Sequence, residues 1–191
     1  NTPNAFTLPV ADSVMAYLLA FARRQPWMDH DMKEGSWQKL PSRSLSECTL
    51  GVVGLGAIGK ALVRRAKSFG MFLLGNDIVE IDHVFLAETG IEMTSLEDLL
   101  ARSDFISLNC DLNPTSHHLI NSARLVMMKS SAVLVNTARG PIIDEPALVS
   151  ALQKGAIAGA ALDVFEFEPL PEDSPLLKMD HVMLAPHNSN S

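Results

Sequence analysis

The sequence predicts an α/β fold with a doubly wound, parallel β-sheet. Two observations lead to this prediction. From Thr49 onward, short apolar runs alternate with segments of helical periodicity, and a glycine-rich turn at residues 54–59 separates the first run from the first helical segment. Strands that alternate with helices in this way are typical of a parallel sheet that carries helices on both faces.

The same patterns place the individual elements. Apolar runs predict strands at residues 50–53, 71–75, 91–94, 105–108, 132–135, 157–162 and 182–184, and helical periodicity predicts helices at residues 57–69, 96–101, 122–129 and 145–154. Gly70 is expected to end the first of these helices, and Ser95 and Asp144 are expected to cap the second and the fourth.

The turn from Gly54 to Gly59 is the strongest single signal in the chain. It follows a predicted strand, opens a predicted helix, and is followed eighteen residues after Gly59 by Asp77, at the end of the next strand. Gly54 allows the tight turn, Gly56 lets the backbone approach a pyrophosphate, and Gly59 lets helix and strand pack closely. The helix N-terminus attracts phosphate, and Asp77 can accept hydrogen bonds from a ribose. The pattern therefore predicts a Rossmann-type core that binds a dinucleotide.

Composition restricts the classes of partner. The chain has 191 residues, 47% hydrophobic and 19% charged, with a net charge of −7, which is typical of a globular protein and argues against nucleic acid or an anionic membrane as partner. The apolar stretch at residues 14–22 is too short to span a bilayer. Two cysteines are too few for a disulfide framework, so we expect a cytoplasmic protein. The six histidines show no metal-ligand spacing with either cysteine, so no metal site is expected.

The first 47 residues do not follow the strand–helix alternation. Residues 9–24 predict a helix with two apolar faces, and residues 25–47, which contain two prolines and the tryptophans Trp27 and Trp37, predict an irregular arm. A helix with two apolar faces usually lies between domains or subunits, so we expect residues 1–47 to form an interdomain and dimerisation segment. Residues 48–191 are expected to form the dinucleotide-binding core. The chain begins with Asn1 rather than methionine, and we interpret it as one domain excised from a longer, two-domain enzyme.

Residues able to do chemistry follow the ends of the predicted strands. In an open parallel sheet, ligands bind outside the carboxyl ends of the strands. The positions just beyond those ends are residues 54–59, Asp77, Cys110, Asp111, residues 137–140, Asp163 and His187. Strand-end loops are often polar in proteins of any function, but this accumulation favours an enzyme.

Three side chains suggest a mechanism. Arg139 carries a planar fork suited to a carboxylate and a neighbouring carbonyl, although a surface salt bridge is the simpler interpretation of an isolated arginine. His187 follows a buried strand and can carry a proton, or can serve only as a capping side chain. Glu168 precedes Pro169 and is either held in a stiff loop or simply solvated. A carboxylate beside an imidazole favours the protonated ring, and with an arginine and a dinucleotide this set suits reduction of a 2-oxo acid to a 2-hydroxy acid.

The chain resembles the NAD-binding domain of the D-isomer-specific 2-hydroxyacid dehydrogenases over its whole length. This family includes glyoxylate/hydroxypyruvate reductases, phosphoglycerate dehydrogenases and D-lactate dehydrogenases. The resemblance rests on several motifs in the expected order: Val10-Ala11-Asp12, the glycine turn, Leu108-Asn109-Cys110 before Leu119-Ile120-Asn121, Asn136 to Gly140, Ala161 to Phe165, Glu168-Pro169 and Pro186-His187.

The resemblance implies a role for each matched residue. Arg139 would bind the substrate carboxylate and carbonyl, and His187 would act as acid/base supported by Glu168. The cofactor-binding residues would be Gly54, Gly56 and Gly59 in the turn, Ala57 and Ile58 against the pyrophosphate, Asp77 at the adenosine ribose, Cys110, Thr137 and Ala138 beside the nicotinamide, and Asp163 at its carboxamide. A carboxylate at position 77 repels a 2′-phosphate, so NAD is expected rather than NADP.

Three features depart from the family pattern. Asp111 stands where proline is more usual, and Asn188-Ser189 replaces the usual small residues after the histidine. The family's substrate domain is absent from this chain, so the isolated fragment is expected to bind cofactor without completing the reaction. The sequence therefore does not indicate which small oxo acid is used.

Two other functions stay open at this stage. Transcriptional co-regulators of the same fold use NAD binding to control assembly, and the apolar helix and the arm suit such a role as well as a homodimeric enzyme. A dehydrogenase acting on phosphite also stays open, whereas formate is disfavoured because formate enzymes of this pattern carry an amide in place of Glu168.

Overall fold

The computed structural model describes residues 6–190, and residues 1–5 of the predicted dimerisation segment, together with Ser191, lie outside the described range. Its centre is a seven-stranded sheet in which every neighbouring pair is parallel, in the order β3-β2-β1-β4-β5-β6-β7. The strands are β1 (Thr49–Val53), β2 (Phe72–Asn76), β3 (Glu92–Met93), β4 (Phe105–Leu108), β5 (Val133–Asn136), β6 (Gly159–Leu162) and β7 (Val182–Leu184). The predicted doubly wound α/β fold is confirmed.

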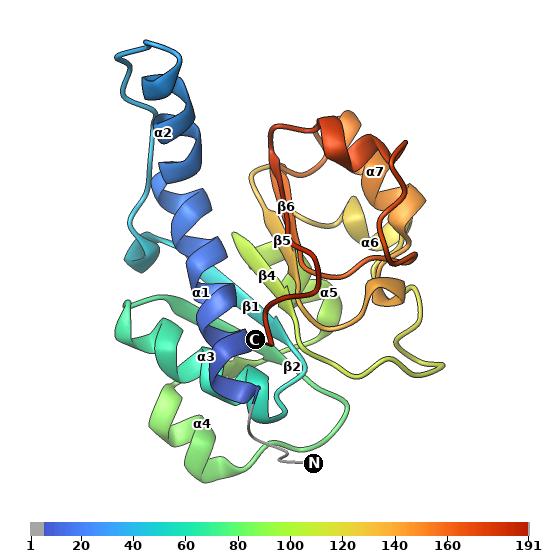
Figure 1. Ribbon diagram of the computed structural model, residues 1–191. Helices are drawn as coiled ribbons and strands as arrows, with labels where there is room; N and C mark the ends of the chain where they lie inside the picture. Colours follow the sequence, from blue (N-terminus) through green and yellow to red (C-terminus); the bar gives the residue numbers. More distant parts are fainter. Residues whose placement is uncertain (1–5, 191) are drawn as a thin grey trace.

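Helices cover both faces of this sheet. One apolar cluster joins it to α1 (Thr7–Arg23), α3 (Ala57–Ser68) and α4 (His83–Thr89), and a second joins it to α5 (Leu96–Arg102), α6 (Ser122–Leu125) and α7 (Glu145–Gln153). Alternate side chains of a strand point to opposite faces. Val133 and Val135 accordingly belong to the first cluster and Leu134 to the second. Figure 1 shows α1 and α3 on one side of the sheet and α6 and α7 on the other.

The strand order reverses between β1 and β4. The chain runs outward from β1 through β2 to β3, and then returns to pair β4 with the other edge of β1. The loops that follow these two strands therefore leave the sheet together. They touch, because a Cβ atom on Gly54 would lie 2.6 Å from the backbone nitrogen of Cys110, and Gly54 itself has a φ of +90°. Such a reversal leaves a crevice at the carboxyl edge of a doubly wound sheet.

The first 47 residues are more helical than expected. α1 confirms the predicted apolar helix, but residues 25–33, predicted as irregular, form helix α2 (Gln25–Lys33). Pro26 lies in the first turn of α2, where a proline has no hydrogen bond to lose and is well tolerated. Trp27 also packs on its own chain, with its indole nitrogen 2.6 Å from the carbonyl oxygen of Asp180, whereas Trp37 is 86% exposed. Figure 1 shows α2 continuing beyond α1 and away from the sheet.

Other elements differ in extent from the prediction. The helix expected at residues 122–129 covers only Ser122–Leu125, and α4, with Asp82 as its capping residue, was not predicted. Short 3₁₀ helices lie at η1 (Leu45–Glu47), η2 (Gly140–Ile142) and η3 (Pro175–Lys178). Asp144 and Ser95 cap α7 and α5 as predicted.

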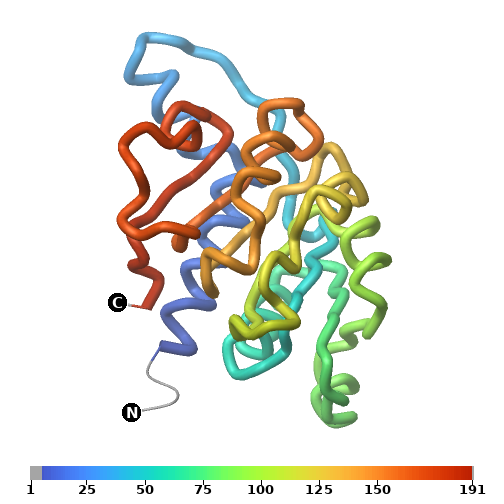
Figure 2. Tube along the Cα trace, turned by 90° about the vertical axis from the view of Figure 1, so that its right-hand side faces the viewer, coloured from blue at the N-terminus to red at the C-terminus, as the bar shows by residue number. Residues whose placement is uncertain are grey.

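Residues 185–190 return to the start of the described chain. Figures 1 and 2 both show this last segment running beside the first turns of α1. The same proximity is seen in the side chains, because Phe6 and Val10 share one hollow with Ser189 and Asn190. The beginning of α1 therefore forms part of the wall of the crevice.

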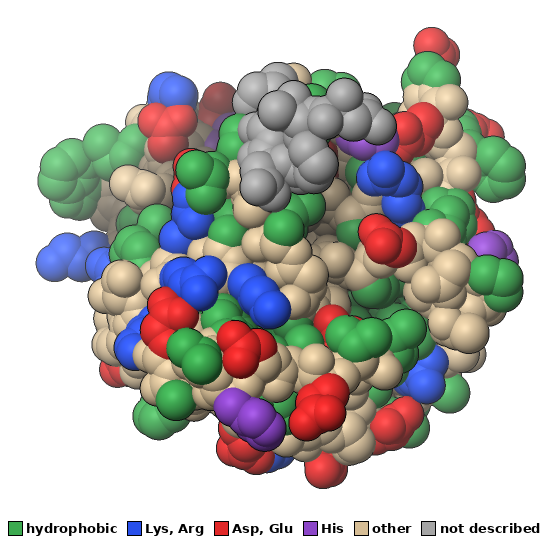
Figure 3. Space-filling view, turned by 90° about the horizontal axis from the view of Figure 1, so that it is seen from below, with side chains coloured by type: hydrophobic (Ala, Val, Ile, Leu, Met, Phe, Trp, Pro, Cys, Tyr) green, Lys and Arg blue, Asp and Glu red, His purple; other side chains and the backbone are tan. Residues whose placement is uncertain are grey.

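Charges on the surface are mixed. On the face drawn in Figure 3, basic and acidic side chains lie next to one another, without a continuous area of either sign. The basic side chains of α3 take part in this pairing, since Arg64 binds Glu88 and Arg65 binds Asp12 at 2.7 and 2.6 Å. Across residues 6–190, no helix is both long and apolar enough to cross a membrane.

Candidate active site

The carboxyl edge of the sheet carries a crevice made of two adjacent hollows. The first has a volume of about 380 Å³ and the second about 610 Å³. Both are lined by Phe6, Ile58, Asn109, Cys110 and Asp111, so they are adjacent and together make up the crevice. The larger hollow lies over the glycine turn and Asp77, and the smaller one contains Arg139 and His187. The crevice thus joins the expected dinucleotide site to the expected catalytic side chains.

The glycine turn fits a bound pyrophosphate. A Cβ atom on Gly59 would lie 2.1 Å from the carbonyl oxygen of Gly54, so Gly59 is required by packing. A Cβ atom on Gly56 would meet nothing within 4 Å, so the space above Gly56 is open. Gly56 is the N-cap residue of α3 and offers no side-chain cap, so the first backbone N–H groups of this twelve-residue helix can bind an anion. These residues provide the open approach and the donors that a dinucleotide needs.

The Asp77 carboxylate is held at the mouth of the larger hollow. One oxygen accepts a hydrogen bond from the Leu55 backbone nitrogen at 2.6 Å, and the other accepts one from Val79 nitrogen at 3.1 Å. The side chain therefore belongs to the same rigid unit as the glycine turn. Ile78 and Val79, both largely exposed, supply no cation beside it.

The Arg139 loop is shaped by the buried residue Asn136 at the end of β5. Its side-chain oxygen accepts from the Ala138 backbone nitrogen at 3.1 Å, and its side-chain nitrogen donates to the Arg139 carbonyl at 3.0 Å. Thr137, Ala138 and Arg139 consequently line the smaller hollow. Asn136 was not predicted as a site residue, although an asparagine two residues before a turn is a signal for this local bonding.

His187 and Glu168 form a hydrogen-bonded pair. Nδ1 of His187 lies 2.9 Å from Oε2 of Glu168, and Oε1 of Glu168 accepts from the Phe165 backbone nitrogen at 3.1 Å. Burial alone would raise the pKa of Glu168, but the hydrogen bonds from His187 and Phe165, with the nearby positive charge of Arg139, lower it below its ordinary value. Glu168 is therefore an ionised acceptor at neutral pH, so Nδ1 of His187 carries the donated proton and Nε2 is left for other partners.

Asp163 holds the backbone that carries His187. Its two carboxylate oxygens accept from the backbone nitrogens of Asn188 and Ser189, each at 2.8 Å, and its carbonyl accepts from His187 nitrogen at 2.8 Å. His187 has a φ of +54°, a left-handed conformation that a non-glycine residue keeps only when its surroundings impose it. Asp163 lines the hollow but is only 1% exposed, so anchoring this turn is the contact that the structure gives it.

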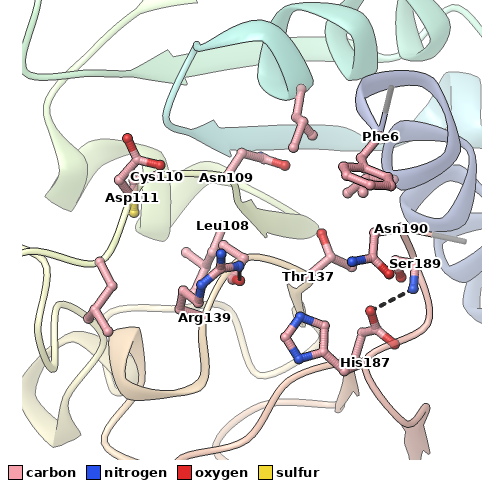
Figure 4. Close-up of a pocket in the computed structure, with 15 residues that line it drawn as sticks. Phe6, Leu108, Asn109, Cys110, Asp111, Thr137, Arg139, His187, Ser189 and Asn190 are labelled. Carbon is pink, nitrogen blue, oxygen red and sulfur yellow. Dashed lines mark hydrogen bonds between the residues drawn. The ribbon is translucent and has the colours of Figure 1, made fainter. Parts of the chain in front are cut away.

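Cys110 also lines both hollows. Burial raises the pKa of its thiol, and the nearby carboxylates of Asp111 and Asp77 raise it further. The thiol is therefore neutral at physiological pH and acts as an apolar wall rather than a nucleophile. Figure 4 shows Cys110 and Asp111 on one side of Arg139, and Ser189 and Asn190 on the side of His187.

The structure brings nearly all of the predicted site residues to this crevice. The two hollows are lined by Gly54, Gly56, Ala57, Ile58, Asp77, Cys110, Thr137, Ala138, Arg139, Asp163 and His187. Gly59 lies beneath the turn against Gly54, and Glu168 reaches the crevice only through His187, since its own side chain lines a separate apolar hollow. Sequence reasoning missed Phe6 and Asn190 as lining residues. Within residues 6–190, no group of three or more His, Cys, Asp or Glu side chains has the geometry of a metal site.

Comparison with known proteins agrees with this arrangement. Residues 15–189 match the family model described as the NAD binding domain of D-isomer specific 2-hydroxyacid dehydrogenase. The chain belongs to this family. It is the nicotinamide-dinucleotide-binding domain, with the Rossmann-like fold that the sequence predicted.

Relatives within the family share both sequence and fold. The chain is 45% identical to a glyoxylate reductase from Korarchaeum cryptofilum over all of its own length and 59% of that protein. It is 34% identical to a D-isomer specific 2-hydroxyacid dehydrogenase from Xanthobacter autotrophicus Py2 solved with NADPH and MES, with a TM-score of 0.90 over 98% of this chain and 59% of that one. A family member from Lactobacillus delbrueckii ssp. bulgaricus in its NAD complexed form gives 28% identity and a TM-score of 0.83 over 95% of this chain and 59% of that one. The chain thus spans about three fifths of the length of these relatives.

We expect the Glu168 carboxyl to titrate below the ordinary glutamate value of about 4.3. Because the His187 hydrogen bond is the largest influence that lowers this pKa, His187→Ala should raise it. A depressed pKa in the folded state means that the pair adds stability above the unfolded value and loses it as pH falls through the folded value. Carbon-13 NMR titration of the glutamate carboxyls, with thermal unfolding between about pH 3 and pH 7, measures both effects. A Glu168 pKa at or above the ordinary glutamate value in the unaltered protein would contradict this expected lowering.

Proposed function

We propose that this protein is an NAD-dependent D-2-hydroxyacid dehydrogenase that reduces a small 2-oxo acid, or oxidises the corresponding 2-hydroxy acid. The observation that carries the proposal is the His187–Glu168 pair, which opens onto the same crevice as Arg139 and the glycine turn. The names of its relatives support the same reaction class. Arg139, Glu168 and His187 are the proposed catalytic set.

Each side chain has a distinct part in the proposed reaction. Arg139 would hold the substrate carboxylate and carbonyl oxygen through its forked N–H groups, fixing the acid in one orientation. His187 would pass a proton from Nε2 to the carbonyl oxygen, or take it back in the opposite direction. Glu168 would keep the ring oriented by accepting a hydrogen bond from Nδ1. A bound nicotinamide dinucleotide would supply or accept the hydride at the substrate carbon.

The residues proposed to hold this dinucleotide divide along the crevice. Gly54, Gly56, Ala57 and Ile58 would lie against the pyrophosphate, with Gly59 supporting the turn. Asp77 would meet the adenosine ribose, while Cys110, Thr137 and Ala138 would line the nicotinamide side. Asp163 would support that side from beneath by holding the His187 turn, and its buried carboxylate remains the proposed partner of the carboxamide.

Replacing His187 tests the proposed chemistry. In the natural full-length protein, His187→Ala should lower the reduction rate of glyoxylate or hydroxypyruvate by roughly 100- to 10,000-fold, because proton transfer to the oxygen is lost. NADH affinity, measured by fluorescence quenching, should change by less than about threefold, because the dinucleotide contacts lie elsewhere. The matched control is His83→Ala, since His83 lies on the outer helix α4. Unchanged turnover in His187→Ala would refute the assignment, and NADH-dependent assembly without reduction of any oxo acid would favour a co-regulator instead.

We further propose a preference for NAD over NADP, which the fixed charge of Asp77 supports. Asp77→Asn keeps an oxygen for the Leu55 backbone N–H but removes the negative charge that would face a 2′-phosphate. Affinity for NADPH should rise roughly tenfold in this variant, with a much smaller change for NADH. Isothermal titration of both cofactors measures this difference. Tighter binding of NADPH than NADH to the unaltered protein would contradict the preference.

A homodimer is the proposed assembly. α2 extends away from the sheet and has no buried residue, and Trp37 beyond it is 86% exposed, which favours contact with a second subunit. Sedimentation of the full-length protein should give a dimer at micromolar concentration, and Trp37→Ser should weaken it. Val126→Ser, at an exposed apolar side chain outside the first 47 residues, is the control. A monomer in the unaltered protein would overturn the proposal.

The free thiols of Cys48 and Cys110 support the proposed cytoplasmic location.

A further inference from the structure

A second histidine–glutamate pair lies behind the crevice. Nε2 of His118 is 2.5 Å from Oε1 of Glu166, with the two side chains 36% and 17% exposed. The residues are 48 positions apart in the sequence, one in the loop that follows β4 and the other in the loop that follows β6. A short, partly buried contact between a ring nitrogen and a carboxylate is stronger than an ion pair on an open surface.

The His118 backbone is also tied to the Arg139 loop. Its N–H donates to the carbonyl oxygen of Pro141 at 2.8 Å, two residues beyond Arg139. His118 has a φ of +49°, and among residues 6–190 only Arg24 and His187 are other non-glycine residues with a positive φ. This conformation is costly for a residue with a side chain and persists where neighbouring contacts hold it. The contacts that hold His118 are those with Pro141 and Glu166 and the stacking of its ring on His117.

The Glu166 end of the pair is tied to the Glu168 loop. Phe165, adjacent to Glu166, donates its backbone N–H to Oε1 of Glu168. Its carbonyl oxygen packs against Gly140, where a Cβ atom would lie only 1.8 Å from it. The segment at residues 165–168 therefore rests directly on the residue that follows Arg139.

A neighbouring carboxylate makes the His118 contact important to Glu166. The Glu166 backbone N–H donates to Glu145 at 3.1 Å. Burial raises the pKa of Glu145, the Glu166 N–H bond lowers it, and the Glu166 side chain raises it again through its negative charge. Without His118, Glu166 would face this second carboxylate without a compensating partner and would move away.

We propose that His118 and Glu166 are positioning residues, which clamp the Arg139 loop to the Glu168 loop and so set the distance between the substrate-binding arginine and the His187 ring. The inference rests on the function proposed above, because its kinetic consequences need an oxo acid held by Arg139. Neither side chain reaches the crevice, since the two hollows are lined by other residues. Both act through the backbone that carries the catalytic set.

The clamp test compares two adjacent histidines. His118→Ala removes the contact with Glu166, whereas His117→Ala removes an imidazole from the same loop, stacked on His118 at 4.1 Å between ring centroids. Hydrogen–deuterium exchange of the full-length protein should become roughly tenfold faster at residues 139–143 and 164–168 in His118→Ala only. The loop at residues 111–117 should keep its protection, because Ser116 and Asn113 bond it internally.

Kinetics then separate positioning from general destabilisation. His118→Ala should reduce kcat/KM for the oxo acid roughly 100-fold, with KM raised as well as kcat lowered, because a displacement near 1 Å is that costly. NADH affinity should stay within about threefold, and His118→Gln, whose amide can donate to Glu166, should recover most of the loss.

The possible outcomes distinguish failure of the clamp from failure of the proposed reaction. Unchanged exchange in His118→Ala, or faster exchange with wild-type kcat and KM, would overturn the clamp. If the unaltered protein binds NADH but reduces no oxo acid, the proposed function fails, while the exchange comparison of His118→Ala with His117→Ala still decides whether the two loops are coupled. Faster exchange confined to His118→Ala, rescued by His118→Gln, would support the clamp.

Discussion

The crevice depends on the parallel pairing of β1 with β4. All neighbouring strand pairs are parallel, so every loop that follows a strand leaves the sheet at the same edge, and the chain reversal between β1 and β4 opens a gap there. Gly54 closes the floor of this gap by approaching the backbone of Cys110 within a distance that no side chain would allow. An anion-binding helix terminus, an arginine and a histidine from distant parts of the sequence therefore meet along one edge.

Buried polar side chains convert this general arrangement into defined positions. Asn136 ends β5 and Asp163 directly follows the neighbouring strand β6, and both are almost completely buried. Asn136 bonds the backbone of the loop after it, and Asp163 bonds the backbone of the segment after β7. Loops held in this way can present Arg139 and the strained turn of His187 without a large entropy cost on substrate binding. The exposed ends of Arg139 and His187, the proposed catalytic groups, are thus supported by buried polar groups.

The sequence predicted the sheet well because strands buried on both faces appear as apolar runs. It failed where a signal had two interpretations. The prolines of residues 25–47 indicate an irregular arm, but Pro26 lies in the first turn of α2. The short α4 contributes only Phe85 and Thr89 as buried residues, too few for a clear helical period. The crevice residues were predictable because strand ends converge in this topology. The anchoring bonds of Asp163 and the contact between His118 and Glu166 were not, since they join segments brought together only by the folded chain.

The His187–Glu168 and His118–Glu166 pairs use the same chemistry for different purposes. The His187–Glu168 pair leaves Nε2 facing the crevice, about two fifths of each side chain being exposed, so the ring can exchange a proton. In the His118–Glu166 pair, Nε2 itself makes the contact and the glutamate is more buried. The proposed role of the His118 ring is therefore to hold two loops together rather than to transfer a proton. Which ring nitrogen binds the carboxylate therefore separates a group suited to chemistry from one suited to holding loops together. Since the loops joined by the second pair carry Arg139 and Glu168, the proposed clamp would link the arginine to the first pair, whose histidine is anchored separately by Asp163.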